Sequence, residues 1–310
     1  GDGRLTAALH AGEGFLVHGL DADAAMVGAA RKHIQSLGLY GNVSVAHWDG
    51  QRLPYIDNFV NLLVVGGQSS VEKEEILRVL CPGGVAVFTT DRGQLTTDKL
   101  VKPWPKEIDQ WTHYLHGPDN NAVAQDTVVG PPKHYQWIGS PNYLRHHDHL
   151  SGLSAMVSAG GRVFYIMDLG PRWSIQMPPQ WTLLARDAFN GTVLWQRPIE
   201  RWHPHLWPLK RGPAQLMRRL VAEDETVYVT LGVGEPVTAL AAAELDLRAA
   251  AAQPAPQQAQ ARAVAGSIEG DREILAQAAA LAVLVQQPQH QPIFRVVIQV
   301  DDGPTPGPVV

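Results

Sequence analysis

A glycine turn and two carboxylates near the start of the sequence are the residues best suited to chemistry. Gly1-Asp2-Gly3 opens the sequence, Asp21 ends an apolar run, and Asp49 lies in His47-Trp48-Asp49-Gly50. Glycines let a backbone approach a ligand closely, and a turn before a helix presents N–H groups to it. A carboxylate at the end of a strand, such as Asp21, can accept hydrogen bonds from two ribose hydroxyls. A carboxylate after the following strand, such as Asp49, can accept a hydrogen bond from an adenine amino group. This order therefore predicts a nucleotide-type site.

Each of these residues also has a plain structural interpretation. A lone Gly-Asp-Gly is commonly a turn, Asp21 serves equally well as a helix cap, and an isolated Asp49 is a turn residue. Asp23 is a weaker ribose candidate than Asp21 because it lies inside the start of the next helix. The prediction of a ligand site depends on the residues occurring together in this order.

The elements that must position these residues alternate between strand and helix over residues 1–100. Apolar runs predict strands at 15–20, 43–46, 59–65 and 85–88, and helical spacing predicts helices at 5–9, 24–37 and 71–80. Asp21 or Asp23 is expected to cap the second helix and Gly38 to end it, whereas Pro82-Gly83-Gly84 is expected to stop the third. The alternation predicts an α/β, doubly wound, Rossmann-like sheet. The strand that should precede Gly1, at the sheet centre, is missing there, so we interpret the sequence as a fragment of a longer protein.

Residues 1–90 resemble a class I S-adenosylmethionine-dependent methyltransferase. The matching segments are Gly1-Asp2-Gly3-Arg4-Leu5, Leu20-Asp21-Ala22-Asp23, Trp48-Asp49-Gly50 with Leu53-Pro54-Tyr55, and Leu80-Cys81-Pro82-Gly83-Gly84. The resemblance implies S-adenosyl-L-methionine as cofactor, with its methionine part at the loop Gly1, Asp2 and Gly3, its ribose at Asp21 and its adenine at Asp49. NAD carries the same ribose diol, but Asp49 and the Leu80–Gly84 element favour the methyl donor.

The sequence departs from this family in three respects. The first strand is absent, Val64-Val65-Gly66-Gly67-Gln68 lacks the acidic or Asn-Pro-Pro pattern that holds an acceptor in some methyltransferases, and no antiparallel pair of strands is evident after Phe88. We assign no catalytic base, although methyl transfer often needs only positioning. An active enzyme and a degenerate, non-catalytic domain are both consistent with these residues.

Beyond Lys102-Pro103-Trp104-Pro105 the helical periodicity ends and a second pattern begins. Short apolar runs predict antiparallel strands at 162–166, 181–185, 192–195 and 226–230, and Asn190-Gly191 predicts a hairpin turn. Residues 185–195 look like the A-x-D-A-x-[TN]-G-x-x-x-W repeat of pyrroloquinoline-quinone-like (PQQ-like) β-propellers, and 236–242 begin a second copy. The resemblance implies an all-β partial propeller at 151–240, with the tryptophan packed between blades.

The order of these segments is similar to large planctomycete-type bacterial proteins in which a methyltransferase domain sits within a quinoprotein-like propeller. That resemblance implies an architecture, with an extracytoplasmic location as one option, and no particular reaction. Active quinoprotein dehydrogenases commonly carry an adjacent cysteine pair, and this chain has one cysteine, Cys81. PQQ is therefore not expected as a cofactor.

The connecting segment 101–150 contains the densest group of residues whose side chains could bind a metal. These are His113, His116, Asp119, His146, His147, Asp148 and His149. Their spacing matches no tight metal motif, so hydrogen bonding is the alternative role. Asp119, His146 and His149 are the candidate ligands, and we expect them to line a polar pocket at the domain junction.

The composition of the sequence limits the kinds of binding partner that can be expected. With 18% charged residues and a net charge of −5, no nucleic-acid surface is expected, and no apolar run is long enough to predict a membrane span. Residues 241–310 form an Ala/Gln/Pro-rich, low-complexity tail, with a helix expected at 274–285 and disorder at 301–310. Two explanations of this composition remain open: a genuine linker with a tail, and an out-of-frame translation.

Three functions follow as hypotheses. The first is a methyltransferase-like module that binds S-adenosyl-L-methionine, joined to a propeller, with a small-molecule or protein acceptor. The second is a non-catalytic binding scaffold with a degenerate methyltransferase and a structural propeller. The third is a fragment of a quinone-dependent dehydrogenase.

Overall fold

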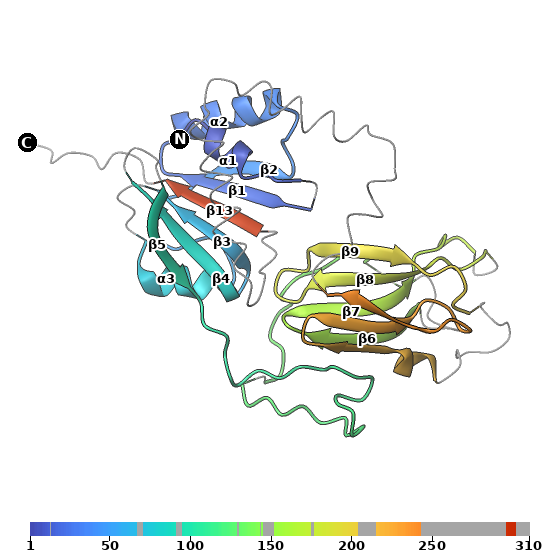
Figure 1. The fold of residues 1–310 in the computed structure, drawn as a ribbon. Coiled ribbons are helices and arrows are strands. Elements are labelled where there is room, and N and C mark those ends of the chain that lie inside the picture. The colour runs from blue at the N-terminus through green and yellow to red at the C-terminus, as the bar shows by residue number, and fades with distance from the viewer. Residues whose placement is uncertain are drawn as a thin grey trace, which may run out of the picture. The chain divides into compact units, whose positions relative to one another are not determined.

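The structure is a computed structural model that describes residues 1–12, 14–66, 71–90, 95–128, 130–142, 144, 152–174, 177–203, 215–242 and 296–301. The chain divides into two compact units (Figure 1). The first comprises Gly1–Trp104 with the C-terminal segment, and the second comprises Pro105–Ala252. The predicted helix at 274–285 lies outside the described residues, as does the predicted disorder at 301–310 except for Asp301, which belongs to a strand.

A six-stranded sheet forms the centre of the first unit, in the order β2-β1-β13-β3-β4-β5. All neighbours in it run parallel except β4 and β5, which are antiparallel. The strands are β1 (Leu16–Asp21), β2 (Val43–His47), β3 (Val60–Val65), β4 (Leu80–Thr89), β5 (Leu95–Val101) and β13 (Val296–Asp301). The predicted α/β sheet with mostly parallel strands is therefore confirmed.

Among the residues that the structure describes, the first unit has three helices: α1 (Arg4–Ala8), α2 (Ala24–Ser36) and α3 (Lys73–Val79). The carboxylate of Asp23 caps α2 by accepting from the Ala25 backbone nitrogen at 2.8 Å, and Gly38, with φ of 69°, follows its end. Residues of α1 and α2 pack on one face of the sheet, and residues of α3 pack on the other. Both faces are thus buried, which explains why β3 is apolar at nearly every position.

The central position of the sheet is occupied by β13, which comes from the C-terminal tail (Figure 1). It pairs in parallel with β1, from Leu16 opposite Val296 to Asp21 opposite Asp301, and with β3 on its other side. The strand expected before Gly1 is not in the sequence, and β13 takes the central position of the sheet instead. Two parallel neighbours with open backbone groups can take any apolar strand of suitable length, wherever it lies in the sequence.

Two details of this unit differ from the predictions. The third helix, predicted at 71–80, is confirmed at Lys73–Val79, but Pro82-Gly83-Gly84 does not end it, because the backbone is already extended at Leu80 and β4 begins there. A Cβ at Gly84 would lie 2.9 Å from the carbonyl oxygen of Val60, so a glycine lets β4 approach β3 at this irregular start. Beyond Phe88, β5 does form an antiparallel pair with β4.

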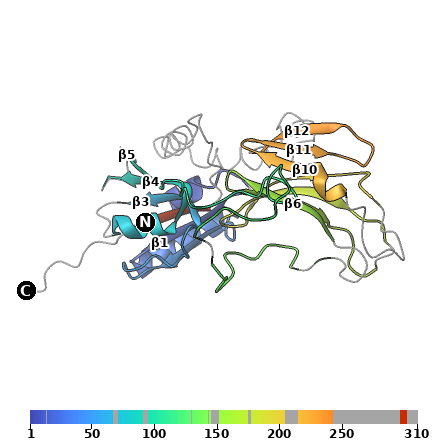
Figure 2. The ribbon, with the colours of Figure 1, turned by 90° about the horizontal axis from the view of Figure 1, so that it is seen from below.

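The second unit contains two antiparallel sheets, in the orders β6-β7-β8-β9 and β10-β11-β12. Figure 2 shows them stacked, and their inward side chains form a single buried cluster that includes Phe164, Trp195, Leu220 and Val227. The four predicted strands are confirmed. The elements are β6 (Leu153–Ala159), β7 (Arg162–Asp168), β8 (Trp181–Asp187), β9 (Val193–Pro198), the short 3₁₀ helix η1 (Leu216–Arg219), β10 (Leu220–Glu223), β11 (Thr226–Thr230) and β12 (Val237–Ala241).

The predicted hairpin turn joins β8 to β9. Gly191 has a φ of 73°, and its N–H donates to the Asp187 carbonyl at 2.9 Å. The Asp187 carboxylate accepts from the backbone nitrogens of Phe189 and Asn190 at 2.8 and 3.1 Å. The turn is therefore present where Asn190-Gly191 predicted it, and it is fixed by Gly191 together with Asp187, which was not part of the prediction.

Candidate functional site

The carboxyl ends of the parallel strands in the first unit meet at one edge of the sheet. From β1 the connection runs to β2 on one side of β13, and from β3 it runs to β4 on the other side. β13 therefore lies at the point where the direction of the strand order reverses. In open α/β sheets, ligands bind outside the carboxyl ends at this point. Backbone bonds tie the edge together, since Trp48 N donates to Asp21 O at 3.0 Å and Gly66 N donates to Val300 O at 2.8 Å.

Asp21 lies at this edge with its carboxylate held by a backbone nitrogen. Its side chain is about 5% exposed. Oδ1 accepts from the Asp23 nitrogen at 2.8 Å, and Oδ2 pairs with the terminal ammonium group of Gly1. An ionised carboxylate offers about four acceptor positions, so these two bonds orient it and leave capacity for two hydroxyl donors. The structure thus brings two sequence-predicted residues, Gly1 and Asp21, into contact.

The rest of the glycine loop has a packing role that sequence reasoning did not separate from ligand binding. Gly3 is buried with a φ of 83°, and a Cβ there would lie 2.8 Å from the Ala30 Cβ on α2. Gly3 therefore allows α1 to approach α2. Asp2 is exposed, accepts from Arg4 N at 3.1 Å and forms an ion pair with the Arg4 side chain. Of this loop, only Gly1 contacts Asp21 through a described hydrogen bond.

Asp49 follows β2 on an exposed loop at the same edge. Its Oδ1 accepts from Gln51 N at 3.1 Å, and its side chain is open to solvent. The preceding Trp48 anchors this loop, because it is 4% exposed and its Nε1 donates to Arg52 O at 2.9 Å. The loop is therefore fixed at its start, and the carboxylate of Asp49 remains accessible to a ligand.

A histidine–tyrosine pair on the first unit was missed by the sequence analysis. The Tyr55 hydroxyl lies 2.7 Å from Nδ1 of His18, a residue of β1. Burial, with a smaller contribution from the charge of Arg31, lowers the pKa of His18, and burial raises the pKa of Tyr55 above its usual range. A single histidine inside the apolar run at 15–20 was the available signal.

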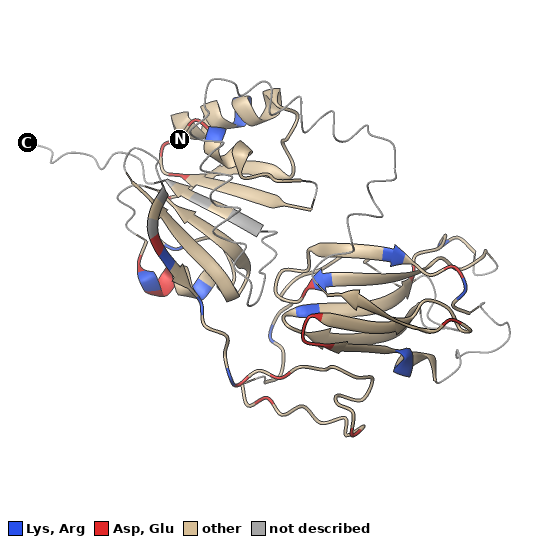
Figure 3. Cartoon of the chain, viewed as in Figure 1, with Lys and Arg blue, Asp and Glu red and all other residues tan. Residues whose placement is uncertain are grey.

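The loop that carries Tyr55 is organised by Arg78 on α3. Its guanidinium donates to the carbonyl oxygens of Leu53 and Tyr55 at 3.0 and 2.7 Å and to the carboxylates of Glu75 and Asp57. These bonds raise the pKa of Arg78, with the Glu75 bond as the largest cause. Figure 3 shows Lys and Arg interspersed with Asp and Glu, and α3 carries both signs.

The candidate metal ligands are not brought together in the described part of the chain. Asp119 is exposed and accepts from Asn121 N at 3.2 Å, while His146 and His149 lie outside the described residues. His116 Nε2 lies 2.6 Å from Asp109 Oδ2, a hydrogen-bonding role. Among the residues that the structure describes, no group of three or more histidines, cysteines or carboxylates could hold a metal.

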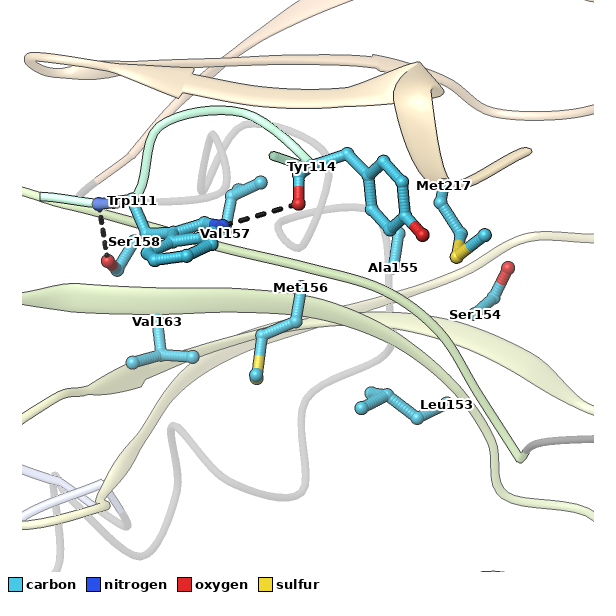
Figure 4. A pocket seen from close by; sticks show the side chains of 10 residues that line it. All are labelled: Trp111, Tyr114, Leu153, Ser154, Ala155, Met156, Val157, Ser158, Val163 and Met217. Carbon is cyan, nitrogen blue, oxygen red and sulfur yellow. Dashed lines mark hydrogen bonds between the residues drawn. The ribbon is translucent and has the colours of Figure 1, made fainter. Parts of the chain in front are cut away.

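A pocket of about 380 Å³ lies in the second unit, along the edge of β6 (Figure 4). Trp111 closes one side, with its Nε1 donating to Tyr114 O at 3.3 Å and its backbone nitrogen to Ser158 Oγ at 3.1 Å. The next residue, Thr112, accepts from Ala222 N of β10 at 3.0 Å, so this segment links the edges of the two sheets. The lining is mainly apolar: Trp111, Tyr114, Leu153, Ser154, Ala155, Met156, Val157, Ser158, Val163 and Met217.

Comparison with known proteins finds similarities for the first unit. The model for "Methyltransferase domain" matches residues 1–84. The chain is 27% identical over 147 residues to the ubiquinone/menaquinone biosynthesis C-methyltransferase UbiE of Yersinia pestis bv. Antiqua, covering 46% of this chain and 54% of that protein. The same enzyme of Yersinia enterocolitica is 27% identical over 146 residues, covering 45% and 54%. The chain thus spans about half the length of these curated relatives.

Solved structures give weaker similarities. Geranyl diphosphate methyltransferase in complex with SAM is 22% identical with a TM-score of 0.24, covering 26% of this chain and 35% of that one. The [4+2]-cyclase SpnF is 28% identical with a TM-score of 0.23, covering 24% and 30%. In the part of the chain that the structure describes, no helix is long and apolar enough to cross a membrane. The part of the chain that matches the methyltransferase model, residues 1–84, is the part that carries Gly1, Asp21 and Asp49.

Proposed function

We propose that the first unit binds S-adenosyl-L-methionine at the carboxyl edge of its sheet and transfers the methyl group to an acceptor. The observation that carries this proposal is the Asp21 carboxylate, which is buried at the strand end and oriented by the backbone nitrogen of Asp23. A buried, pre-oriented carboxylate with unused acceptor positions fits the two hydroxyls of a ribose. The residues present therefore fit the adenosyl part of the cofactor.

Each part of the site has a binding role in this proposal. Asp21 accepts from the ribose hydroxyls, the backbone at Gly1 faces the methionine part, and the accessible Asp49 accepts from the adenine amino group. The bound cofactor supplies an electrophilic methyl group on a sulfonium sulfur. The protein then contributes by holding donor and acceptor in line, which accelerates a displacement without a general base.

The acceptor is proposed to be a small molecule with a carbon nucleophile. Support comes from the curated relatives, whose names describe C-methyltransferases. A protein acceptor is the alternative, and product analysis after incubation with labelled cofactor distinguishes the two. A methyl group recovered on a protein side chain would contradict the small-molecule proposal.

Calorimetric titration with S-adenosylhomocysteine tests the cofactor site. We expect Asp21→Ala to weaken binding by about tenfold or more, because charge-assisted hydrogen bonds contribute roughly 1.5–3 kcal/mol. Asp23→Ala is the matched control. It removes the α2 cap, which costs about 1 kcal/mol of stability, but it leaves the backbone nitrogen that orients Asp21. Equal affinity of Asp21→Ala and the unsubstituted chain would contradict the proposed site.

We further infer that the second unit contributes two successive blades of a PQQ-like propeller that serves as a binding scaffold. In support, β6–β9 form a four-stranded antiparallel meander, β10–β12 repeat its first three strands, and both sheets share one core. Trp195, from the repeat-like element, donates its Nε1 proton to Ala242 O at 3.0 Å, just after β12. No observation on the described residues of this unit specifically favours the hypothesis of a quinone-dependent dehydrogenase.

The contact made by Trp195 gives this inference its test. We expect Trp195→Phe to speed amide hydrogen exchange in β10–β12, because loss of one buried hydrogen bond costs about 1 kcal/mol, roughly fivefold in exchange rate. Trp173→Phe, at a site that is 84% exposed, is the control and should leave exchange unchanged. Unaltered exchange in both variants would show that the two sheets are not coupled as blades.

A further inference from the structure

One edge of β6 is covered by a neighbouring segment over only part of its length. β6 is the end strand of its sheet and, among the described strands, pairs with β7 alone. Along its other edge, the Gln110 side chain accepts from Gly160 N at 2.7 Å, and the Trp111 carbonyl accepts from Ser158 N at 2.7 Å. Residues 110 and 111 therefore follow this edge in the direction opposite to β6.

The segment leaves the edge at Thr112. The Thr112 carbonyl accepts from Ala222 N of β10 at 3.0 Å, so the chain crosses to the other sheet instead of continuing along β6. In an antiparallel strand the backbone groups of residues two apart point to the same edge, so those of Met156 point outward as those of Ser158 do. Within the described part of the chain, no hydrogen bond reaches the N–H or the C=O of Met156. The edge of β6 is thus open at Met156.

The pocket of about 380 Å³ lies at this open part of the edge (Figure 4). The neighbours of Met156 on β6 point into the buried cluster between the sheets, whereas the Met156 side chain is 53% exposed on the opposite face. In the view of Figure 4, Tyr114 and Met217 lie above β6, and Met156 and Val163 lie below it. A chain that continued along the edge would therefore find apolar surface for its side chains on both faces.

We propose that the open edge of β6 binds an extended peptide segment of a partner protein, which adds an antiparallel strand in continuation of residues 110–111. The peptide main chain exchanges two hydrogen bonds with Met156, and its alternate side chains contact the two apolar sides of the pocket. This inference goes beyond methyl transfer and does not depend on it, because all the residues that carry it belong to the second unit.

Two features favour a peptide over a small apolar molecule. An outward N–H and C=O on one residue form the donor–acceptor pair that a strand residue matches with its own two backbone groups. The two serine hydroxyls of the lining already accept hydrogen bonds, that of Ser158 from Trp111 N at 3.1 Å and that of Ser154 from Trp202 Nε1 at 2.9 Å. The main chain at Met156 therefore provides the directed contact for a ligand.

Fluorescence anisotropy with the full chain tests the proposal. The probe is a labelled peptide of six residues in which valine and threonine alternate, because both residues favour strands. We expect saturable binding. A second peptide of the same sequence, N-methylated at every amide, keeps the side chains but cannot donate from its backbone, and we expect it to bind at least about tenfold more weakly.

A pair of variants tests the same contact from the side of the protein. Met156→Pro removes the outward N–H and leaves the bonds between β6 and β7 in place, because proline is tolerated where the N–H of an edge strand faces away from the sheet. We expect it to weaken binding about fivefold, the loss that corresponds to one hydrogen bond. Met156→Leu keeps both the N–H and the apolar side chain, and it is the matched control.

Three results would overturn the proposal. One is equal affinity of the methylated and unmethylated peptides for the unsubstituted chain, since the pocket would then recognise side chains alone. Another is equal affinity of Met156→Pro and Met156→Leu for the unmethylated peptide. The third is an absence of binding by that peptide to an unsubstituted chain whose β7 and β8 amides are protected from exchange.

Discussion

At the scale of single residues, the glycine loop combines a contact to the candidate site residue Asp21 with a packing constraint. The nitrogen of Gly1 contacts Asp21, whereas Gly3, two residues later, provides space for α2. Both glycines were predicted as one ligand-binding turn, because a sequence pattern does not show which neighbour approaches a missing Cβ. The distinction leads to a stability prediction that is independent of any ligand.

We expect Gly3→Ala to destabilise the first unit by about 1–3 kcal/mol, because the new Cβ meets Ala30 at 2.8 Å and φ is 83°. Gly28→Ala should have the opposite sign. Gly28 lies in α2, and no atom lies within 4 Å of the place that a Cβ would take, so a helix-favouring residue adds about 0.5–1 kcal/mol. Urea midpoints, followed by pulsed hydrogen exchange of α2 and β1, measure both. Similar effects of the two substitutions would contradict the packing role of Gly3.

His18 makes the first unit sensitive to pH. Burial and Arg31 lower its pKa, so the folded chain binds a proton less readily than the unfolded chain, whose histidine titrates near 6.5. The stabilising contribution is therefore present above about pH 6.5 and is lost as the pH falls through the lowered pKa. We expect the unfolding free energy of β1 and β2, from hydrogen exchange corrected for intrinsic rates, to fall as the pH is lowered from about 7 to about 5.

His18→Gln should flatten that dependence, since glutamine does not titrate but can still hydrogen bond to Tyr55. The exposed His134→Gln is the control and should retain the wild-type slope. A wild-type slope in His18→Gln would show that another group causes the loss of stability.

At the scale of elements, hydrogen bonds from Arg78 connect α3 to the loop at 51–58. A lysine keeps the charge but cannot form the several directed bonds that the guanidinium makes to Leu53, Tyr55, Glu75 and Asp57. We expect Arg78→Lys to destabilise the first unit by about 1–3 kcal/mol. Arg31→Lys, which removes a single directed bond to Val45 O, should cost less than about 1 kcal/mol. Comparable urea midpoints for the two variants would contradict this role of Arg78.

The local sequence pattern was sufficient to predict most helices and strands. It failed for strands that form only because they pair with a segment far away in the sequence. The capped helix α2 and the apolar strands β1 and β3 follow from periodicity and end signals within each segment. β5 was missed because its sequence, with Thr96, Asp98 and Lys99, lacks an apolar run. β13 was missed because its short apolar run adjoins a segment of biased composition, and no local feature shows that it pairs with β1 and β3.

The candidate site shows the same limit. The order of Gly1, Asp21 and Asp49 could be predicted, since each follows or precedes a recognisable element. The pairing of His18 with Tyr55 could not, because it joins positions far apart in the sequence through the side chains of two different elements. Whether His146 and His149 meet Asp119 stays a prediction, as does the assignment of each cofactor contact.

At the scale of the whole molecule, the chain combines two units with separate cores. The first buries apolar residues on both faces of a mostly parallel sheet, and the second buries them between two antiparallel sheets. The tail contributes a central strand to the first unit while following the second in sequence.

The central claim is that this chain binds a methyl donor at the carboxyl edge of its sheet. The most direct measurement is a calorimetric titration of S-adenosylhomocysteine into the full, folded chain. The account predicts saturable binding at one site per chain, which Asp21→Ala weakens by about tenfold or more. An absence of binding in a sample whose β1 and β3 amides are protected from exchange would contradict it.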